Sequence, residues 1–461
     1  MSASHDCEVA VVGAGVVGTA IARELAAHGV DTMLIEAAGD VGAGTTKANT
    51  AIWHTGFDAT PGTLEARLVR RGWQRLAEVG PELGIPLQAT GALLVAWDEA
   101  QLAELDGIAA RAAAGGYDRC TRIDAATLYA REPGLGAGAL GALVVPDEGL
   151  LCPFTMPIAF ATQAIAGGAR LWLDAEVLDA VTDRGVGRHR LHTRRGEATA
   201  RYVVNAAGLQ ADRINASFGH DGFTVTPRRG QLLVFDRLAG ELLEHIVLPV
   251  PTARTKGMLV APTVHGNVLV GPTAEDLDDR EATETTAEGY DALRSWAARV
   301  LPGLLEEDVT AAYAGLRAAT EHSDYQIFAD PATGYVCVGG IRSTGLSSCL
   351  AIAEHVVGLL QDGGLATTAP RELPEIALPY LGADRPRPCR APGAIAADPA
   401  YGRVVCHCES VSEGEIRDAL DGPLPARDAD GLRRRTRAGQ GRCQGFHCGA
   451  HVDQLLAEAR R

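Results

Sequence analysis

The sequence predicts an α/β protein with a small cysteine-rich unit at its C-terminal end. Three observations lead to this prediction: a glycine-rich turn between an apolar run and a helical stretch at 8–28, a proline-rich segment at 366–400, and four paired cysteines after it. The chain has 461 residues, 46% of them hydrophobic and 22% charged, which is typical of globular proteins with a sizeable core. At about 150 residues per domain, this length corresponds to roughly three units.

The first forty residues follow the pattern of a dinucleotide-binding unit. An apolar run at 8–12 leads into the turn GAGVVG at 13–18, a helical stretch follows at 19–28, and a second apolar run at 32–35 ends in Glu36. The glycines let backbone N–H groups approach a pyrophosphate at the helix N-terminus. Glu36 lies 18 residues after the last of these glycines, which suits an acid that binds an adenosine ribose hydroxyl. We therefore predict a Rossmann-type dinucleotide site.

Two further turns of small residues favour FAD over NAD as the dinucleotide. The stretch GAGTTKAN at 42–49 is a second glycine- and hydroxyl-rich turn, and the run YVVNAAG at 202–208 leads from a strand into another turn. Turns of this kind bring the backbone close to a ligand. Several distant turns that converge on one ligand suit FAD, because it spans more of the fold than a mononucleotide does.

Four motifs are spread over residues 5–365: the turn at 13–18 with Glu36, KANTAIWHTG at 47–56, GLR at 315–317 and GGIRSTGL at 339–346. Together they resemble the FAD-dependent oxidoreductases of the D-amino-acid-oxidase (DAO) type. The resemblance implies a Rossmann-type FAD-binding domain interleaved with an antiparallel-sheet substrate domain over residues 1–365. It places the FAD-binding segments at about 5–80, 150–225 and 310–365, and the substrate-domain segments at about 81–149 and 226–309.

Two branches of this family have motifs similar to those of the chain. The stretch GNVLVGPT at 266–273 is similar to the glycerol-3-phosphate dehydrogenase branch, whose large subunit carries a C-terminal iron–sulfur domain. HTG at 54–56, followed by PGTL at 61–64, is similar to the L-2-hydroxyglutarate oxidase branch. The first branch is the main hypothesis and the second the alternative. A third hypothesis is a non-catalytic flavin and iron–sulfur electron-transfer subunit.

The resemblance also implies a set of FAD contacts distributed over the chain. They are Gly13, Gly15, Gly18, Glu36, Thr45, Thr46, Lys47, Asn49, Val177, Ala207, Gly208, Gly340, Gly345 and Leu346. The last two residues open a helical run at 347–360. The N-terminus of such a helix places partial positive charge where the anionic ring edge of the reduced flavin is expected.

His54 is the candidate catalytic base. Oxidation of a secondary alcohol passes a hydride to the flavin while a base accepts the hydroxyl proton, and histidine suits this role because its ordinary pKa lies near 6.5. His54 follows the turn that wraps the cofactor, and the resemblance supports a place in the substrate site. It either deprotonates the substrate or orients it.

Arg317, Arg342 and Lys256 are the candidate cations for an anionic substrate. Arginine clamps a carboxylate or a phosphate with two hydrogen bonds, and each of these arginines leaves an apolar strand in a glycine-flanked turn. The chain has only two lysines, Lys47 and Lys256, among 42 basic residues. A lysine retained at position 256 therefore suggests a compact ammonium that contacts a phosphate or the flavin.

Four cysteines lie beyond the proline-rich linker at 366–400. Cys406 and Cys408 are separated by one residue, Cys443 and Cys448 by four, and 34 residues lie between the two pairs. Two such pairs ligate one soft metal centre, either zinc or a [2Fe-2S] cluster.

The segment 401–461 resembles the small helical [2Fe-2S] domain of bacterioferritin-associated ferredoxins (BFD), which implies a cluster at these cysteines. SEGE at 412–415 predicts a capping box at the start of a short helix. The arginines at 433–435, 437 and 442 are expected to offset the negative charge of the cluster, and Cys448 is expected to gain thiolate stabilisation at a helix N-terminus.

These features lead to a functional prediction: an FAD-dependent dehydrogenase that oxidises a small anionic secondary alcohol, sn-glycerol 3-phosphate being the first choice. The resemblance implies that electrons pass through the [2Fe-2S] centre to an acceptor subunit or a quinone pathway. The net charge of −16 argues against a nucleic-acid partner, and no apolar run is long enough to span a membrane. Asp6 and Glu8, without a basic n-region, predict no signal peptide, so we expect a cytoplasmic protein that a partner could hold at the inner membrane face.

Overall fold

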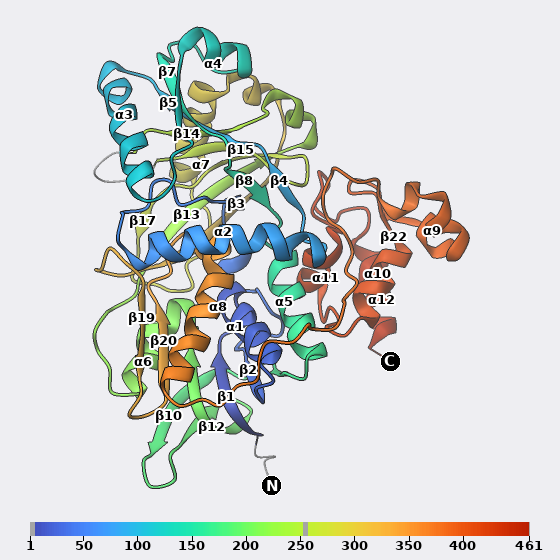
Figure 1. Ribbon diagram of the computed structural model, residues 1–461. Helices are drawn as coiled ribbons and strands as arrows, with labels where there is room; N and C mark the ends of the chain where they lie inside the picture. Colours follow the sequence, from blue (N-terminus) through green and yellow to red (C-terminus); the bar gives the residue numbers. More distant parts are fainter. Residues whose placement is uncertain (1–4, 252–256, 461) are drawn as a thin grey trace.

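The computed structural model describes residues 5–251 and 257–460 (Figure 1). Two large sheets with their helices form the body, and a small C-terminal domain lies against it (Figure 1). The predicted fold class, a DAO-like α/β body with a small helical C-terminal domain, is confirmed.

The first sheet is the dinucleotide-binding sheet, and it is parallel at its centre. Strand β1 pairs in parallel with β2 and β12, and β12 pairs in parallel with β20. Its eight strands are β1 (His5–Val12), β2 (Thr32–Ile35), β9 (Arg170–Trp172), β10 (Val177–Asp183), β11 (Arg188–Thr193), β12 (Gly196–Asn205), β19 (Gln326–Asp330) and β20 (Tyr335–Gly339). The central strands are continuous apolar runs because helices cover both faces of the sheet.

Helices on both faces bury this sheet. One face packs against α1 (Val16–Ala27), α5 (Thr155–Ala166) and α8 (Gly345–Asp362), and the other against α6 (Ala211–Ser217). Helix α2 (Leu64–Glu82) crosses α8 closely, since a Cβ added at Gly72 would lie 2.2 Å from the Ser347 carbonyl oxygen. These contacts hold the start of α8 beside the carboxyl ends of the parallel strands.

The second sheet is mainly antiparallel and forms the substrate domain. Its nine strands are β5 (Ala92–Ala96), β6 (Thr121–Asp124), β7 (Gly141–Val145), β13 (Thr226–Phe235), β14 (Ile246–Pro249), β15 (Leu259–Pro262), β16 (Val268–Gly271), β17 (Glu275–Asp276) and β18 (Val309–Ala319). Its helices are α3 (Glu99–Ala114), α4 (Ala125–Arg131) and α7 (Ala287–Val300), and a small sheet of β3 (Ile52–Trp53), β4 (Leu87–Ala89) and β8 (Gly149–Leu151) lies between the domains.

Strand β18 corrects one predicted boundary. The sequence placed residues 310–365 in the FAD-binding domain, but β18 pairs along its whole length with β13 of the substrate sheet. The chain returns to the dinucleotide-binding sheet only at β19. The reason is that β18 is a long strand of the substrate sheet whose C-terminal half, from Gly315, lines the cavity between the two sheets.

The C-terminal part begins as an extended segment and ends in three helices. Residues 366–387 contain no helix or strand, whereas α9 (Pro392–Ala397) lies inside the segment expected to be linker. The small domain then contains β21 (Val404–Cys406), β22 (Val411–Ser412), α10 (Glu413–Asp421), α11 (Ala429–Thr436) and α12 (Gly449–Ala459). The capping box at Ser412 and Glu415 is confirmed. Among the described residues, no helix has the length and apolar character required to cross a bilayer.

Candidate active site and cluster site

A cavity of about 1750 Å³ lies between the two sheets. It runs from the glycine turn after β1 to strands β13 and β18 of the substrate sheet. The residues predicted to contact FAD that line it are Gly13, Gly15, Glu36, Thr45, Thr46, Asn49, Val177, Ala207, Gly208, Gly340, Gly345 and Leu346. His54, Arg317 and Arg342 line the same cavity, whereas Lys256 lies outside the described residues.

The glycine turn at 13–18 leaves room for a ligand because it lacks side chains. Gly13 has a φ of +100°, and a Cβ there would lie 2.5 Å from the Ala206 carbonyl oxygen. Gly18 faces the turn rather than the cavity, since its Cβ would lie 1.9 Å from the Gly13 carbonyl oxygen. Gly15 lines the cavity at the start of α1, where the helix presents free N–H groups.

Glu36 is fixed at the end of β2 by backbone N–H groups. Its carboxylate accepts hydrogen bonds from Ala14 N at 2.6 Å and Ala38 N at 2.8 Å. Burial raises the pKa of Glu36 above its ordinary value although these N–H groups favour the charged form. The carboxyl group faces the cavity at the position that the ribose acid occupies in dinucleotide-binding units.

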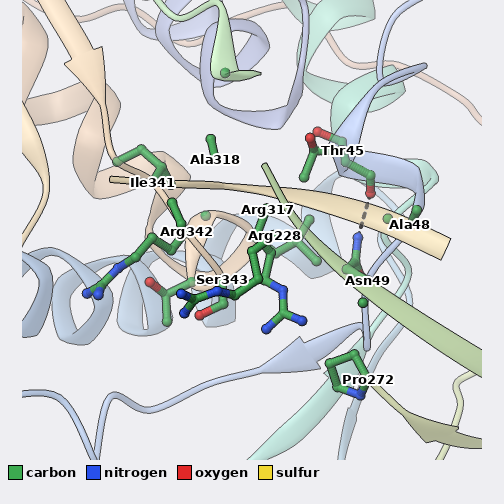
Figure 2. A pocket seen from close by; sticks show the side chains of 18 of the residues that line it. Thr45, Ala48, Asn49, Arg228, Pro272, Arg317, Ala318, Ile341, Arg342 and Ser343 are labelled. Atoms are coloured by element: carbon green, nitrogen blue, oxygen red, sulfur yellow. Dashed lines mark hydrogen bonds between the residues drawn. The ribbon is translucent and has the colours of Figure 1, made fainter. Parts of the chain in front are cut away.

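The second turn, at 44–49, is tied to both domains. Thr46 Oγ1 accepts a hydrogen bond from Val16 N at 3.0 Å, and Thr45 Oγ1 donates to the Leu316 carbonyl at 2.9 Å. Asn49 Nδ2 donates to the Thr46 carbonyl at 2.6 Å (Figure 2). Lys47 was predicted to contact FAD, but it does not line the cavity. Its Nζ donates a hydrogen bond to Asp430 of the C-terminal domain at 3.0 Å.

Helix α8 begins at the cavity. Residues 343–346 line it, and neither Ser343 nor Thr344 caps the helix through a side-chain hydrogen bond. The glycine cradle, the acid after β2, the second turn and this helix N-terminus together fit an extended dinucleotide such as FAD.

His54 lies between two carboxylates in the loop after β3. Its Nδ1 contacts Glu148 Oε1 at 2.9 Å, its Nε2 contacts Asp58 Oδ1 at 2.9 Å, and its backbone N donates to Ser347 Oγ at the start of α8. Burial opposes the imidazolium, but Glu148 and Asp58 outweigh burial and raise the pKa of His54 from 6.5 to about 10. The imidazole is therefore protonated at neutral pH in this arrangement.

Glu148 and Asp58 were not predicted from the sequence, although both line the cavity. Glu148 is 1% exposed and also accepts hydrogen bonds from Thr55 N and Thr55 Oγ1, both at 2.7 Å. It is 94 residues from His54 in the sequence, so no local motif could connect the two. Asp58 lies one helical turn's spacing from His54, which was the only signal available.

Arg317 lies on β18 at the cavity, opposite Arg228 of β13 (Figure 2). Its Nη2 donates to the Thr273 carbonyl at 2.6 Å, and no other described residue places a carboxylate within salt-bridge distance of it. Arg228, by contrast, is bound to Asp276 through two hydrogen bonds. Burial and the charge of Arg228 lower the pKa of Arg317 to about 10. Arg317 is thus a partly buried cation without a salt-bridge partner among the described residues, although the charge of Asp276 acts on it from a greater distance.

Arg342 is already paired. Its Nη2 contacts Glu65 of α2 at 3.0 Å, and Glu65 also accepts a hydrogen bond from Thr344 Oγ1 at 2.8 Å. The arginine therefore lines the cavity with its charge offset. Arg342 stays a candidate cation for the substrate, but it would have to exchange Glu65 for the substrate anion.

The four predicted cysteine ligands come together in the C-terminal domain. Cys408 and Cys443 form one hydrogen-bonded thiol pair, and Cys406 and Cys448 form the other. Within residues 5–251 and 257–460, no three His, Cys, Asp or Glu side chains are arranged as ligands of a single metal ion. Two pairs of thiols on adjoining loops fit the donor set of a [2Fe-2S] cluster.

The loop between the second pair of cysteines favours a thiolate. N–H groups of His447, Gly445 and Phe446 lower the pKa of Cys443. Cys448 starts α12 as predicted, but burial and the neighbouring Cys406 raise its pKa to about 11. The expected thiolate stabilisation is therefore found at Cys443 instead.

The arginines before Cys443, which were expected to offset the cluster charge, pair mainly with carboxylates in this structure. Arg434 and Arg435 bind Asp40 of the dinucleotide-binding domain, Arg437 binds Glu409, and Arg442 binds Asp236. Arg434 and Arg435 therefore pair with a carboxylate of the body, whereas Arg437 pairs with the residue after Cys408, and Arg442 lies close enough to Cys408 for the thiol to act on its pKa. The sequence showed the charge but not the partners, which come from other parts of the chain.

Comparisons with known proteins agree with this geometry. Residues 8–359 match the family model for FAD dependent oxidoreductase (DAO), and residues 404–458 match the BFD-like [2Fe-2S] binding domain. The chain is 36% identical to a glycerol 3-phosphate dehydrogenase of Caloramator mitchellensis, over 98% of this chain and 94% of the relative. It is 26% identical to one subunit of the anaerobic glycerol-3-phosphate dehydrogenase of Haemophilus influenzae, over 98% of this chain and 85% of that one.

A solved structure has the same fold as the body of the chain. It is the dithionite-reduced L-alpha-glycerophosphate oxidase of Mycoplasma pneumoniae with FAD bound, at a TM-score of 0.74 and 28% identity, covering 79% of this chain and 96% of that one.

Proposed function

The chain belongs to the FAD-dependent oxidoreductase (DAO) family, with a BFD-like [2Fe-2S] binding domain, and from this premise we propose that it oxidises sn-glycerol 3-phosphate to dihydroxyacetone phosphate. The observation that carries the proposal is Arg317, a partly buried guanidinium at the cavity with no carboxylate partner among the described residues. A guanidinium in this state favours an anion that can accept two hydrogen bonds, and a phosphate does so.

The substrate site needs only one strong anion contact. Five arginines in the described part of the chain line the cavity: Arg228 is neutralised by Asp276 and Arg342 by Glu65, and Arg213 and Arg299 are exposed. Arg317 is the half-buried one among the described residues that no carboxylate pairs with, so we assign the phosphate to it. A dicarboxylate such as L-2-hydroxyglutarate would need two cations at opposite ends. The relatives named glycerol 3-phosphate dehydrogenases support a substrate with a single anionic head group, because they match nearly the whole chain.

When bound, FAD supplies the hydride acceptor and the [2Fe-2S] cluster supplies a one-electron carrier. The residues that would hold FAD are the glycine turn, Glu36 and the turn at 44–49, and the residues that would hold the cluster are Cys406, Cys408, Cys443 and Cys448.

We assign the proton of the substrate hydroxyl to His54. Glu148 holds Nδ1 and fixes the ring orientation, so that Nε2 is the nitrogen available to the substrate. Without substrate, Asp58 occupies Nε2 and keeps the ring protonated. A substrate hydroxyl that replaces Asp58 at Nε2 removes one of the two stabilising carboxylates, so the ring gives its Nε2 proton to the departing Asp58 carboxylate or to solvent. The neutral Nε2 then accepts the hydroxyl proton, while the hydride leaves the carbon for the FAD that the cavity would hold.

The likeness to one component of an anaerobic dehydrogenase supports a protein partner that accepts electrons from the cluster domain. The alternative is a quinone pathway reached through such a partner.

The proposal is tested by anaerobic addition of candidate substrates to the FAD- and cluster-loaded protein. We expect sn-glycerol 3-phosphate to bleach the flavin absorbance, and Arg317→Met to need a much higher concentration for the same bleaching. Bleaching by L-2-hydroxyglutarate instead would assign the alternative substrate. The absence of bleaching with any phosphorylated polyol or hydroxy acid would leave a non-catalytic electron-transfer role as the better description.

A further inference from the structure

The cluster domain contacts the FAD-wrapping segment through a buried ion network. Asp40 lies between Glu36 and the turn at 44–49 and is 3% exposed. Arg435 binds both of its carboxylate oxygens, at 2.7 and 2.9 Å, and Arg434 binds one of them. Both arginines belong to α11, which lies against α5 of the body (Figure 1).

The network also reaches the other end of the same segment. Arg434 binds Asp430 as well as Asp40, and Asp430 accepts a hydrogen bond from Lys47 Nζ. Helix α11 therefore binds both ends of the segment 40–47, Asp40 through Arg434 and Arg435 and Lys47 through Asp430.

Asp40 is connected to the glycine turn by two short steps. Its Oδ1 accepts a hydrogen bond from Val41 N at 2.8 Å, and the next residue, Gly42, donates its N–H to the Ala14 carbonyl at 2.9 Å. Ala14 also donates its N–H to Glu36. Asp40, which the cluster domain binds, is thus connected by hydrogen bonds to the glycine turn at 13–18 and to Glu36.

Burial makes the Asp40, Arg434 and Arg435 part of this network sensitive to the loss of a partner, whereas Lys47 and Asp430 are 38% and 53% exposed. Burial opposes the charge of Asp40, but Arg435 and Arg434 hold its pKa below the ordinary value. Arg434 and Arg435 are 2% and 4% exposed. Removing one member of a buried ion pair leaves an uncompensated charge. Segment 40–47 and helix α11 therefore depend on each other for their positions.

We propose that Asp40, Arg434 and Arg435 are positioning residues for FAD: by docking on Asp40, the cluster domain holds segment 36–49 in its FAD-binding conformation. FAD retention and a folded cluster domain then stabilise each other, because coupling between two binding events is reciprocal. The inference depends on FAD and the cluster and not on which alcohol the enzyme oxidises.

The first test is Asp40→Asn in the full-length protein with its cluster loaded. We expect the FAD dissociation constant, measured from flavin fluorescence, to rise at least tenfold while the cluster absorbance and EPR signal stay at the wild-type level. Arg434→Lys and Arg435→Lys retain a positive charge near Asp40 and should lose less affinity than the corresponding methionine variants.

The matched control is Arg427→Met. Arg427 pairs with Asp174 at 2.8 Å across the same domain boundary, but this pair is about half exposed, and exposed pairs contribute little. We expect its FAD dissociation constant to stay within twofold of the wild-type value. A wild-type FAD dissociation constant in Asp40→Asn would overturn the proposal.

The second test uses only wild-type protein, so it still tests the proposal if Asp40→Asn loses both FAD and the cluster. The rate at which an iron chelator removes the cluster is compared between the FAD-loaded and the FAD-depleted chain. We expect the cluster to be lost several times faster without FAD. Equal rates would show that the two sites are independent, whatever the flavin does with the alcohol substrate.

Discussion

The carboxylate at Nε2 of His54 should control the pH at which the enzyme works. Glu148 and Asp58 raise the pKa of His54 from its ordinary 6.5 to about 10 against the effect of burial, which corresponds to about 5 kcal/mol of preference for the protonated ring. Each carboxylate contacts one ring nitrogen at 2.9 Å. Because the two carboxylates also overcome burial, removing one charge should cost at least half of this net preference, roughly 2–3 kcal/mol or more.

Asp58→Asn removes this charge and keeps the size of the side chain. If neutral His54 is the base, kcat/KM rises with pH up to the His54 pKa of the free enzyme. In the variant, we expect the rise to occur at least one pH unit lower than in the wild type, so that kcat/KM near pH 7.5 increases about tenfold or more. The assay is the pH profile of kcat/KM for sn-glycerol 3-phosphate from pH 6.5 upward, above the phosphate pKa near 6.

Glu132→Gln is the matched control for this experiment. Glu132 is a buried carboxylate that contacts His245 Nδ1 at 2.7 Å, and neither residue lines the cavity. The pH profile of kcat/KM for Glu132→Gln should equal that of the wild type. If Asp58→Asn shows the wild-type profile, or a profile shifted to higher pH, then His54 is not the group whose proton limits the reaction.

Four further predictions follow from the same contacts. Arg317→Met should raise the KM for sn-glycerol 3-phosphate about 30-fold or more, because a truncated charge pair costs roughly 2–5 kcal/mol, while FAD content stays unchanged; a change confined to kcat would contradict the phosphate contact. Glu65→Gln should release Arg342 from its partner and raise binding of a dicarboxylate relative to the phosphate substrate, measured as the ratio of kcat/KM values. Cys406→Ser with Cys443→Ser should abolish the cluster EPR signal, yet substrate should still bleach any FAD that remains bound. The ion pairs of His54 with Glu148 and Asp58 should stabilise the fold fully below pH 6.5 and progressively less up to about pH 10, because the folded state holds the His54 proton more tightly. Denaturant titrations at several pH values should show that the free energy of unfolding depends less on pH in Asp58→Asn than in the wild type.

Local patterns were enough to predict the parts of the site that the chain forms by itself. The glycine turn lies within one strand–helix–strand unit, and Glu36 and the turn at 44–49 follow its second strand directly, so spacing along the sequence predicts their spacing in the fold. The spacing within each cysteine pair of the sequence is similarly local, because one residue separates Cys406 from Cys408 and four separate Cys443 from Cys448.

Contacts between distant segments could not be predicted in the same way. Glu148 reaches His54 only because β8 pairs with β3, and Asp40 meets Arg435 only because the C-terminal domain docks on the body. Arg317 and Arg342 have similar glycine-flanked surroundings in the sequence, but the partners that distinguish them, Thr273 and Glu65, come from other elements. The position of β18 in the substrate sheet depends on its pairing with β13 and not on its composition.

The most direct test of the proposed function is a single anaerobic turnover of the fully loaded enzyme with sn-glycerol 3-phosphate in limiting amount. We expect dihydroxyacetone phosphate to form in proportion to the flavin reduced, followed by the appearance of the reduced cluster signal in EPR. Flavin reduction without dihydroxyacetone phosphate, or no reduction by this substrate when another anionic alcohol reduces the flavin, would contradict the assignment.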